Sequence, residues 1–157
     1  MGVSEPGHKP PRQLAHELLH AYNAHDPKAA ADLYAEAGTH SDVANGRPRI
    51  GRAAISSGLT GLLRAFPDAA WAVEDVAGGP GCAAVRYRLT GRLRSTLGRY
   101  QGFGQPLDLV GVLWVWVSAG EVTRTEDFWD AATFDRQMQS APDTLSGSAS
   151  HEGTTSS

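Results

Sequence analysis

The chain has 157 residues, of which 41% are hydrophobic, and a formal net charge of −3. This length is typical of one domain with a sizeable core, and the apolar content excludes a wholly disordered chain. The slight acidic excess argues against a nucleic-acid-binding protein.

The single cysteine, Cys82, excludes an internal disulfide and a thiolate zinc cluster. The longest apolar run, residues 109–117, is about half the length of a membrane helix. The polar start of the chain lacks a secretory pattern, so we expect a soluble cytoplasmic protein.

The first half of the chain predicts helices. Apolar residues recur at Leu14, Leu18, Leu19 and Tyr22, a spacing typical of an amphipathic helix. Asp26 followed by Pro27 is an N-cap signal and predicts a short helix over residues 27–34. Residues 38–43 predict a short strand. A further set of apolar residues at helical spacing predicts a third helix that Pro67 ends, namely Ile55, Leu59, Leu62, Leu63 and Phe66.

The second half predicts strands over residues 71–76, 82–93, 107–117 and 122–130, and then a short helix over 133–139. Residues 82–93 alternate between apolar and polar side chains, and residues 107–117 are apolar on both faces, which predicts a central strand covered on each side. Helices followed by antiparallel strands indicate an α+β fold. We expect a curved antiparallel sheet wrapped around the N-terminal helices, forming a cone-shaped barrel with one internal pocket.

The domain boundaries follow from composition. Residues 1–11 are polar and Pro-rich, and residues 140–157 are rich in Ser, Thr and Gly with one large apolar residue, Leu145. Such segments bury too little apolar surface to fold. We therefore predict a single domain over residues 12–139 between a disordered arm and a disordered tail.

One motif in the first helix resembles a zinc-protease signature. His16, Glu17 and His20 form an H-E-x-x-H pattern. Asn23 stands where the extended version of the motif has glycine, and few residues precede the motif. His16, His20 and Asn23 also share the polar side of the predicted helix. We therefore interpret them as a solvated polar face and expect no metal site.

Several segments, in order, resemble the SnoaL-like polyketide cyclases. They are residues 21–23 (AYN), 66–76 (FPDAAWAVEDV), 85–91 (VRYRLTG), 104 and 109–112 (G and LVGV), and 120–122 (GEV). The resemblance spans residues 14–138. It implies the nuclear-transport-factor-2-like fold, a curved antiparallel sheet over three helices, commonly as a homodimer. A polyketone carbon between two carbonyl groups is already fairly acidic, so one carboxylate with hydrogen-bond donors for the enolate could suffice, and we expect no metal or cofactor.

The resemblance also implies candidate site residues. The acid/base Asp of the family's last strand matches Asp127, and a pocket aromatic of the first helix matches Tyr22. A His that some cyclases carry on the preceding strand is replaced by Leu113, which removes one proton carrier. Because side chains alternate along a strand, Thr125, Asp127 and Trp129 share one face.

A carboxylate facing Leu, Val and Trp side chains is poorly solvated, and desolvation raises its pKa toward the range that suits a general acid/base. Asp127 could instead pair with Arg124 or cap the following helix. We further expect a set of substrate-binding residues around the pocket, namely Trp129, Tyr87, Leu113, Thr125, His40 and Asp42. His40 and Asp42 share a strand face and form a second candidate acid/base pair, unless they are a surface pair on a loop.

These observations predict a cofactor-independent cyclase acting on a hydrophobic polyketide-type intermediate in secondary-metabolite biosynthesis. Asp127 is the predicted acid/base, and Tyr22 orients or polarises a carbonyl. Three alternatives stay open: an epoxide-opening hydrolase or cyclase, an isomerase, and a non-catalytic small-molecule-binding dimer. Trp114 and Trp116 fall on the sheet face away from the pocket, and two adjacent exposed indoles would form an unusual apolar patch. We therefore expect a homodimer through this face, and neither a nucleic-acid nor a membrane partner.

Overall fold

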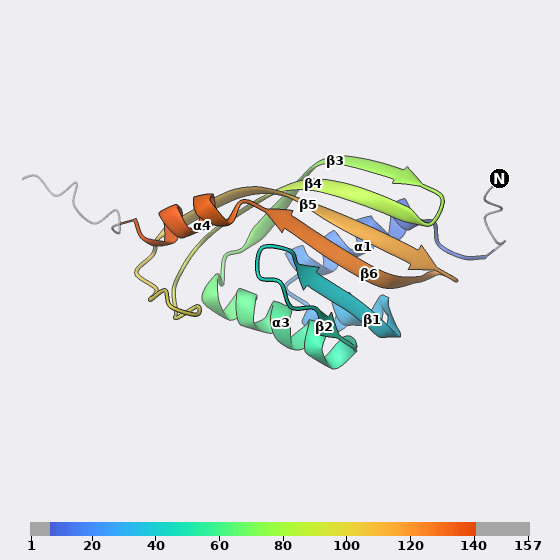
Figure 1. Cartoon of the computed structure of the whole chain (residues 1–157), viewed down its shortest axis with the longest axis horizontal. Coiled ribbons are helices and arrows are strands. Elements are labelled where there is room, and N and C mark those ends of the chain that lie inside the picture. Colours follow the sequence, from blue (N-terminus) through green and yellow to red (C-terminus); the bar gives the residue numbers. More distant parts are fainter. Residues whose placement is uncertain (1–6, 141–157) are drawn as a thin grey trace, which may run out of the picture.

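The structure, a computed structural model, describes residues 7–140. Its elements, in chain order, are α1 (Pro11–Asn23), α2 (Pro27–Asp32), β1 (Tyr34–Asp42), β2 (Arg49–Ile50), α3 (Arg52–Ala65), β3 (Ala70–Gly79), β4 (Cys82–Arg92), β5 (Pro106–Ser118), β6 (Glu121–Trp129) and α4 (Ala131–Met138) (Figure 1). Most of the predicted arm and tail, residues 1–6 and 141–157, lies outside the described residues. No helix within residues 7–140 is long and apolar enough to cross a membrane.

The helices form where the apolar spacing predicts them. Helix α1 buries Leu14, Leu18 and Leu19 on one face, and the Asp26 carboxylate caps α2 by accepting a hydrogen bond from the Ala29 amide at 3.0 Å. The predicted end of the second helix is wrong. Helix α2 ends at Asp32, and Tyr34 begins β1 as a fully buried strand residue.

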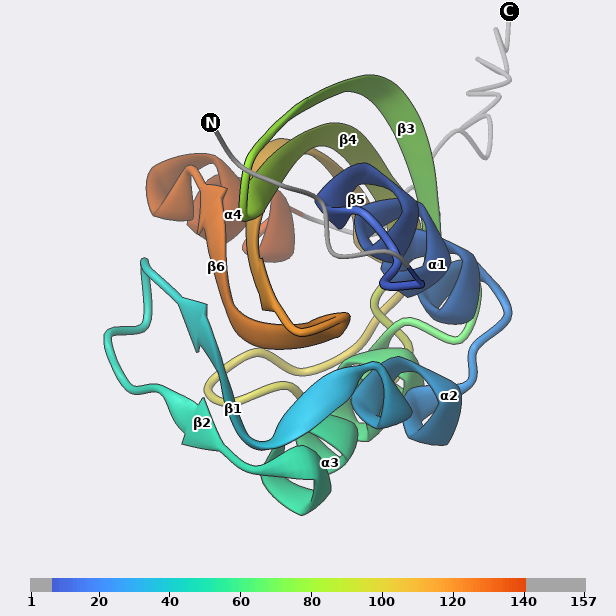
Figure 2. The ribbon, with the colours of Figure 1, turned by 90° about the vertical axis from the view of Figure 1, so that its right-hand side faces the viewer.

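The six strands form one curved sheet in the order β2-β1-β6-β5-β4-β3. All neighbours are antiparallel except β1 and β6, which run parallel. The sheet ends in two edges, β2 and β3, so it is an open cone and not a closed barrel. Figure 2 shows β3, β4 and β5 arching over α1, with α2 and α3 on the other side of the fold.

Burial along the central strands follows the pleat. In β5, Leu107, Leu109, Leu113 and Val115 are buried against the helices. On the opposite face Trp114 is 40% exposed, and it stacks on Trp116 with ring centroids 5.6 Å apart. The covering predicted on both faces of this strand is therefore present on one face only within residues 7–140.

The H-E-x-x-H pattern of α1 lies on a polar face, as expected. His16 and His20 are exposed, and Glu17 pairs with Lys9 at 3.0 Å. None of these three belongs to a group of side chains within residues 7–140 that could hold a metal ion. Asn23 corrects the expectation of a purely solvated face, because its amide group makes two hydrogen bonds of 2.8 Å with the backbone of Trp71 and joins α1 to β3.

Candidate active site

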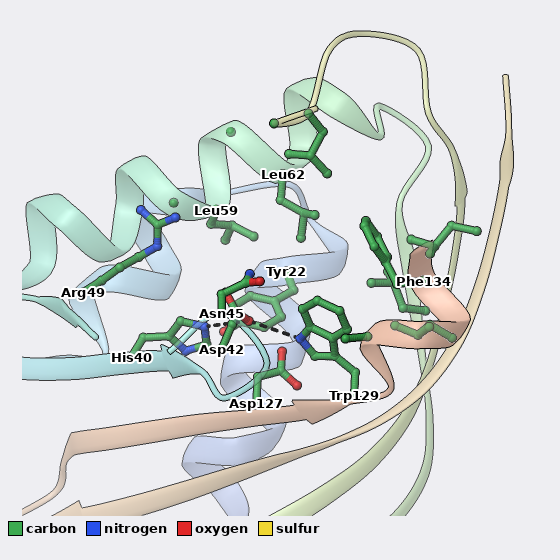
Figure 3. Close-up of a pocket in the computed structure, with 18 of the residues that line it drawn as sticks. Tyr22, His40, Asp42, Asn45, Arg49, Leu59, Leu62, Asp127, Trp129 and Phe134 are labelled. Atoms are coloured by element: carbon green, nitrogen blue, oxygen red, sulfur yellow. Dashed lines mark hydrogen bonds and ion pairs between the residues drawn. The ribbon is translucent and has the colours of Figure 1, made fainter. Parts of the chain in front are cut away.

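A cavity of about 640 Å³ lies inside the cone. Its walls come from the concave side of the sheet, helix α3, the loop that contains residues 97–100, and helix α4. Most of the wall is apolar, with Leu59 and Leu62 from α3, Trp129 from β6 and Phe134 from α4 (Figure 3). A cavity of this size and lining suits a small hydrophobic molecule.

Three ionisable side chains meet in this cavity. The parallel pairing of β1 with β6 places Asp42 opposite Asp127 and His40 opposite Thr125. One ligand atom from each of His40, Asp42 and Asp127 lies within 4.8 Å of the other two. Two strands far apart in the sequence therefore bring an imidazole and two carboxylates together.

Asp127 is held by a hydrogen bond that reaches across the sheet. The Tyr87 hydroxyl on β4 donates to Asp127 Oδ1 on β6 at 2.6 Å. Gly111, the β5 residue between them, pairs with Tyr87 on one side and with Trp129 on the other. A Cβ at Gly111 would overlap the Tyr87 hydroxyl. The glycine is therefore required for the phenol to pass over β5.

The environment of Asp127 raises its pKa from 3.8 to about 7. Burial is the main cause, because it disfavours the charged carboxylate. The negative charge of Asp42 acts in the same direction, whereas the Tyr87 hydrogen bond and His40 oppose the shift. Near neutral pH the carboxyl group can therefore both accept and donate a proton.

Asp42 behaves in the opposite way. Burial alone would raise its pKa, but His40, the Trp129 indole and the charge of Arg49 outweigh burial and lower the pKa below its ordinary value. The His40 Nε2 lies 3.6 Å from Asp42 Oδ1, and Trp129 Nε1 donates to the same oxygen at 3.5 Å. Asp42 is therefore ionised where Asp127 is half protonated.

A row of hydroxyl groups supports the imidazole. The Thr125 hydroxyl lies 2.7 Å from His40 Nδ1 and 2.7 Å from the Tyr34 hydroxyl. Tyr34 in turn interacts with the hydroxyl of Tyr22, whose pKa burial raises well above its ordinary value. With Nδ1 occupied by Thr125, His40 presents Nε2 toward Asp42.

The predicted site residues divide into two groups. The structure brings Tyr22, His40, Asp42, Tyr87, Asp127 and Trp129 to the cavity wall. The expectation that Leu113 and Thr125 line the pocket is wrong. Both share the concave face with Asp127, but they are almost fully buried in the core and do not reach the cavity. The Thr125 hydroxyl instead forms the 2.7 Å hydrogen bond with His40 Nδ1. The alternative that His40 and Asp42 form a surface loop pair is also wrong, because both lie at the end of β1 inside the cone.

Other wall residues were missed from the sequence. Asn45 and Arg49 come from the connection between β1 and β2 and from β2 itself, and Phe134 comes from α4. Gly58 and Gly61 in α3 were a sequence signal for this wall of the cavity, because glycine is unfavourable inside a helix and its presence there needs a local reason. Both line the cavity. The space beside Gly61 is open, whereas the space beside Gly58 is occupied by the Arg49 side chain.

The same three ionisable residues are the group within residues 7–140 that could hold a metal ion. One His nitrogen and two carboxylate oxygens would suit a divalent cation. However, Tyr87 already occupies one oxygen of Asp127, and a carboxyl group with a pKa of about 7 is half protonated near pH 7. The arrangement fits proton transfer at least as well as metal binding, and the two are separable by experiment.

The raised pKa of Asp127 makes a prediction about stability. Because the folded state binds this proton more tightly than the unfolded state, the contribution of Asp127 is full at low pH and is lost as pH rises toward about 7. Asp127→Asn stays neutral and avoids this loss. We expect the free energy of unfolding of the variant, relative to the wild type, to increase by roughly 2 kcal/mol between pH 5 and pH 8. Urea unfolding at both pH values measures this difference.

Asp108→Asn is the matched control. Asp108 is an exposed carboxylate on β5 whose pKa is lowered by its hydrogen bonds with Arg88. Its stabilising effect is complete above pH 5, so its difference from the wild type stays constant from pH 5 to pH 8. A pH-independent difference for Asp127→Asn would contradict the raised pKa.

Solved structures of similar fold support the architecture. A candidate polyketide cyclase from Xanthomonas campestris pv. campestris is 24% identical, with a TM-score of 0.74 over 81% of this chain and 98% of that chain. A candidate polyketide cyclase from Pseudomonas putida KT2440 is 20% identical, with a TM-score of 0.75 over 82% and 98%. AclR, a candidate hydroxylase from Streptomyces galilaeus, is 19% identical, with a TM-score of 0.71 over 83% and 96%. At these identities the likeness shows the fold.

The sequence comparisons place the chain in a family. A search of curated proteins found no match. Residues 15–125 match the SnoaL-like domain. This segment runs from α1 into β6 and covers most of the chain, so the protein belongs to the SnoaL-like domain family.

Proposed function

We propose that the protein is a cofactor-independent cyclase that acts on a hydrophobic polyketide-type intermediate in secondary-metabolite biosynthesis. One observation carries the proposal: Asp127, with a pKa of about 7, faces a largely apolar cavity that can hold such a molecule. A carboxyl group with this pKa is suited to general acid/base catalysis at neutral pH. The candidate cyclases of similar fold agree with this choice of reaction.

The proposed reaction is an intramolecular aldol ring closure. The Asp127 carboxylate takes a proton from a carbon that lies between or beside carbonyl groups. The resulting enolate carbon attacks a second carbonyl of the same molecule, so that a carbon–carbon bond forms and the carbonyl oxygen becomes an alkoxide. Asp127 then returns its proton to this oxygen. The proton is recovered in the product, and no oxidant or reductant is consumed.

The surrounding groups support charge development in this reaction. Tyr22 keeps its proton, since its pKa is raised, and its ring lies at the cavity wall. Its hydroxyl group interacts with Tyr34, so it must change partner to hold a substrate carbonyl. A hydrogen-bond donor beside the substrate carbonyl stabilises the developing enolate, and Tyr22 can supply it once its hydroxyl turns from Tyr34 to the substrate.

Epoxide opening is the second candidate, and the two unlike carboxyl groups favour it. Asp127 would protonate the epoxide oxygen, while the ionised Asp42 would accept a proton from the attacking water or hydroxyl group. Both carboxyl groups are then required. An isomerase would need only a proton shuttle at Asp127, and a binding module would need neither group.

Ring closure is tested with 4-phenylheptane-2,6-dione, a hydrophobic 1,5-diketone whose aldol product is a 3-hydroxycyclohexanone. Acid treatment of the quenched sample removes water from this product and gives a cyclohexenone with a distinct ultraviolet absorbance. We expect the wild type to catalyse product formation and Asp127→Asn to lower the rate by about 100-fold or more, because removal of a general acid/base has effects of this size. Circular dichroism checks that the variant folds. An unimpaired Asp127→Asn variant would disprove the assignment.

Two controls separate the alternatives. Glu126→Gln changes the neighbouring carboxylate, which pairs with Arg124, and should leave the rate unchanged. Asp42→Asn should slow ring closure less than Asp127→Asn, whereas opening of trans-stilbene oxide would require both carboxyl groups. Treatment with EDTA should have no effect. Loss of activity with EDTA that added Mn²⁺ or Zn²⁺ restores would assign the three residues to a metal instead.

We also propose that two copies of the chain associate through the convex face of the sheet. Trp114 and Phe128 are each 40% exposed and Val110 is 46% exposed on this face, and Figure 2 shows it turned away from α1. Positively and negatively charged side chains, such as the ion pair of Arg88 with Asp108, lie on the same face. A two-fold contact between identical surfaces can bury the apolar residues and match the charges.

Trp114→Arg tests this association. We expect light scattering after size exclusion to give a dimer for the wild type and a monomer for the variant, because a charge replaces the indole at the contact. Phe103→Arg changes another exposed aromatic residue, 60% exposed on the loop before β5, and should remain dimeric. A monomeric wild type would contradict the proposal.

A further inference from the structure

We propose that Arg49 binds an acidic group on the substrate, so that the protein selects hydrophobic ketones that carry a carboxylate. The inference rests on the proposed cyclase and deepens it, because it names the substrate class and the residue that orients it. Three properties of Arg49 support it: its position in the sheet, its packing against a glycine of α3 and its unoccupied N–H donors.

The position of Arg49 follows from strand pairing. Strand β2 pairs antiparallel with β1, and Arg49 lies directly opposite His40. Directly opposed residues project to the same face of a sheet. Arg49 and His40 therefore both line the cavity. In Figure 3, Arg49 and Phe134 lie on opposite sides of the cavity, with Asp127 and Tyr22 between them.

The guanidinium group is seated on a glycine. Gly58 of α3 lies against the Arg49 side chain, and a Cβ at this position would overlap its Nε, Cζ and Cδ atoms. Glycine lowers the stability of a helix interior, so its presence here has a local cost. The missing side chain lets the arginine lie close against α3 at the rim of the cavity.

The donors of Arg49 are free. Among residues 7–140 its guanidinium has neither a hydrogen bond nor an ion pair within contact distance, although its charge lowers the pKa of Asp42. Arg99 also lines the cavity, but it already binds Asp135 and Tyr100. Arg49 is therefore the cation at the cavity, within the described part of the chain, that can take a new anionic partner.

The chemistry of the group fits a carboxylate. Arginine presents a planar fork of N–H donors that can bind both oxygens of a carboxylate at once. Asp42, which is ionised, and Asp127 would repel a substrate carboxylate from the centre of the cavity. The acidic group therefore lies at Arg49, the apolar body points toward Leu62 and Phe134, and the ketone between them lies over Asp127.

Binding of 2-naphthylacetate and of its methyl ester tests the inference, because the two probes share one apolar body and differ in charge. We expect isothermal titration calorimetry to show that Arg49→Gln weakens binding of the acid by about tenfold, as loss of a charge-assisted pair does. Binding of the ester should change less than twofold. Added NaCl should weaken binding of the acid alone.

Three further arms complete the experiment. Arg47→Gln removes the same charge from a neighbouring exposed residue outside the cavity wall and should leave both probes unaffected. Gly58→Ala improves helix propensity but displaces the guanidinium, so it should weaken binding of the acid and spare the ester. 2-Naphthyl phosphate separates a carboxylate site from a phosphate site, and tighter binding of the phosphate would overturn the carboxylate assignment.

The inference is overturned if Arg49→Gln leaves binding of the acid unchanged, if it weakens the acid and the ester equally, or if neither probe binds the wild type. These outcomes are independent of turnover. Asp127-dependent ring closure of the neutral diketone, together with equal binding of the acid by the wild type and Arg49→Gln, would preserve the cyclase and remove the substrate class. Selective binding of the acid without any ring closure would preserve Arg49 as the site of a carboxylate and contradict the proposed cyclase.

Discussion

The burial of one carboxyl group, under the hydroxyl of Tyr87, organises this molecule. Asp127 sits on a strand whose neighbours are apolar, and burial raises its pKa to about 7. The phenol reaches it only because Gly111 leaves the space above β5 empty. The hydrogen bond from Tyr87 opposes the shift, since it favours the charged form. Desolvation therefore raises the pKa of Asp127, and the hydrogen bond from Tyr87 limits the increase.

The fold contributes the second half of the site through a parallel strand. Strand β1 returns beside β6 and brings Asp42 next to Asp127. The two carboxyl groups differ because His40, Trp129 and Arg49 act on Asp42, whereas burial dominates at Asp127. When two neighbouring groups have different pKa values, the difference is the usual basis for assigning one as the acid and the other as the base. The open edge at β2 places Arg49 at the rim of the same cavity.

Much of this arrangement could be predicted from the sequence, and the failures have physical reasons. Alternation along β4 and β6 correctly placed Tyr87, Asp127 and Trp129 on the concave face, because pleating is a local property. Leu113 shares that face but lies deep in the core, and alternation alone does not show how far along a strand the cavity extends. The pairing of β1 with β6 joins segments about 85 residues apart in contacts such as His40 with Thr125, and no local signal encodes it. Arg49 was missed for the same reason.

The proposed function depends on the ionisation of Asp127, and carbon NMR can measure this ionisation directly. In protein labelled with ¹³C at the aspartate carboxyl groups, the signal missing from Asp127→Asn identifies the residue, and its chemical shift is followed from pH 4 to pH 9. We expect a single titration with a pKa near 7. A pKa near 4, the ordinary value for an exposed aspartate, would contradict both the buried environment and the proposed acid/base role.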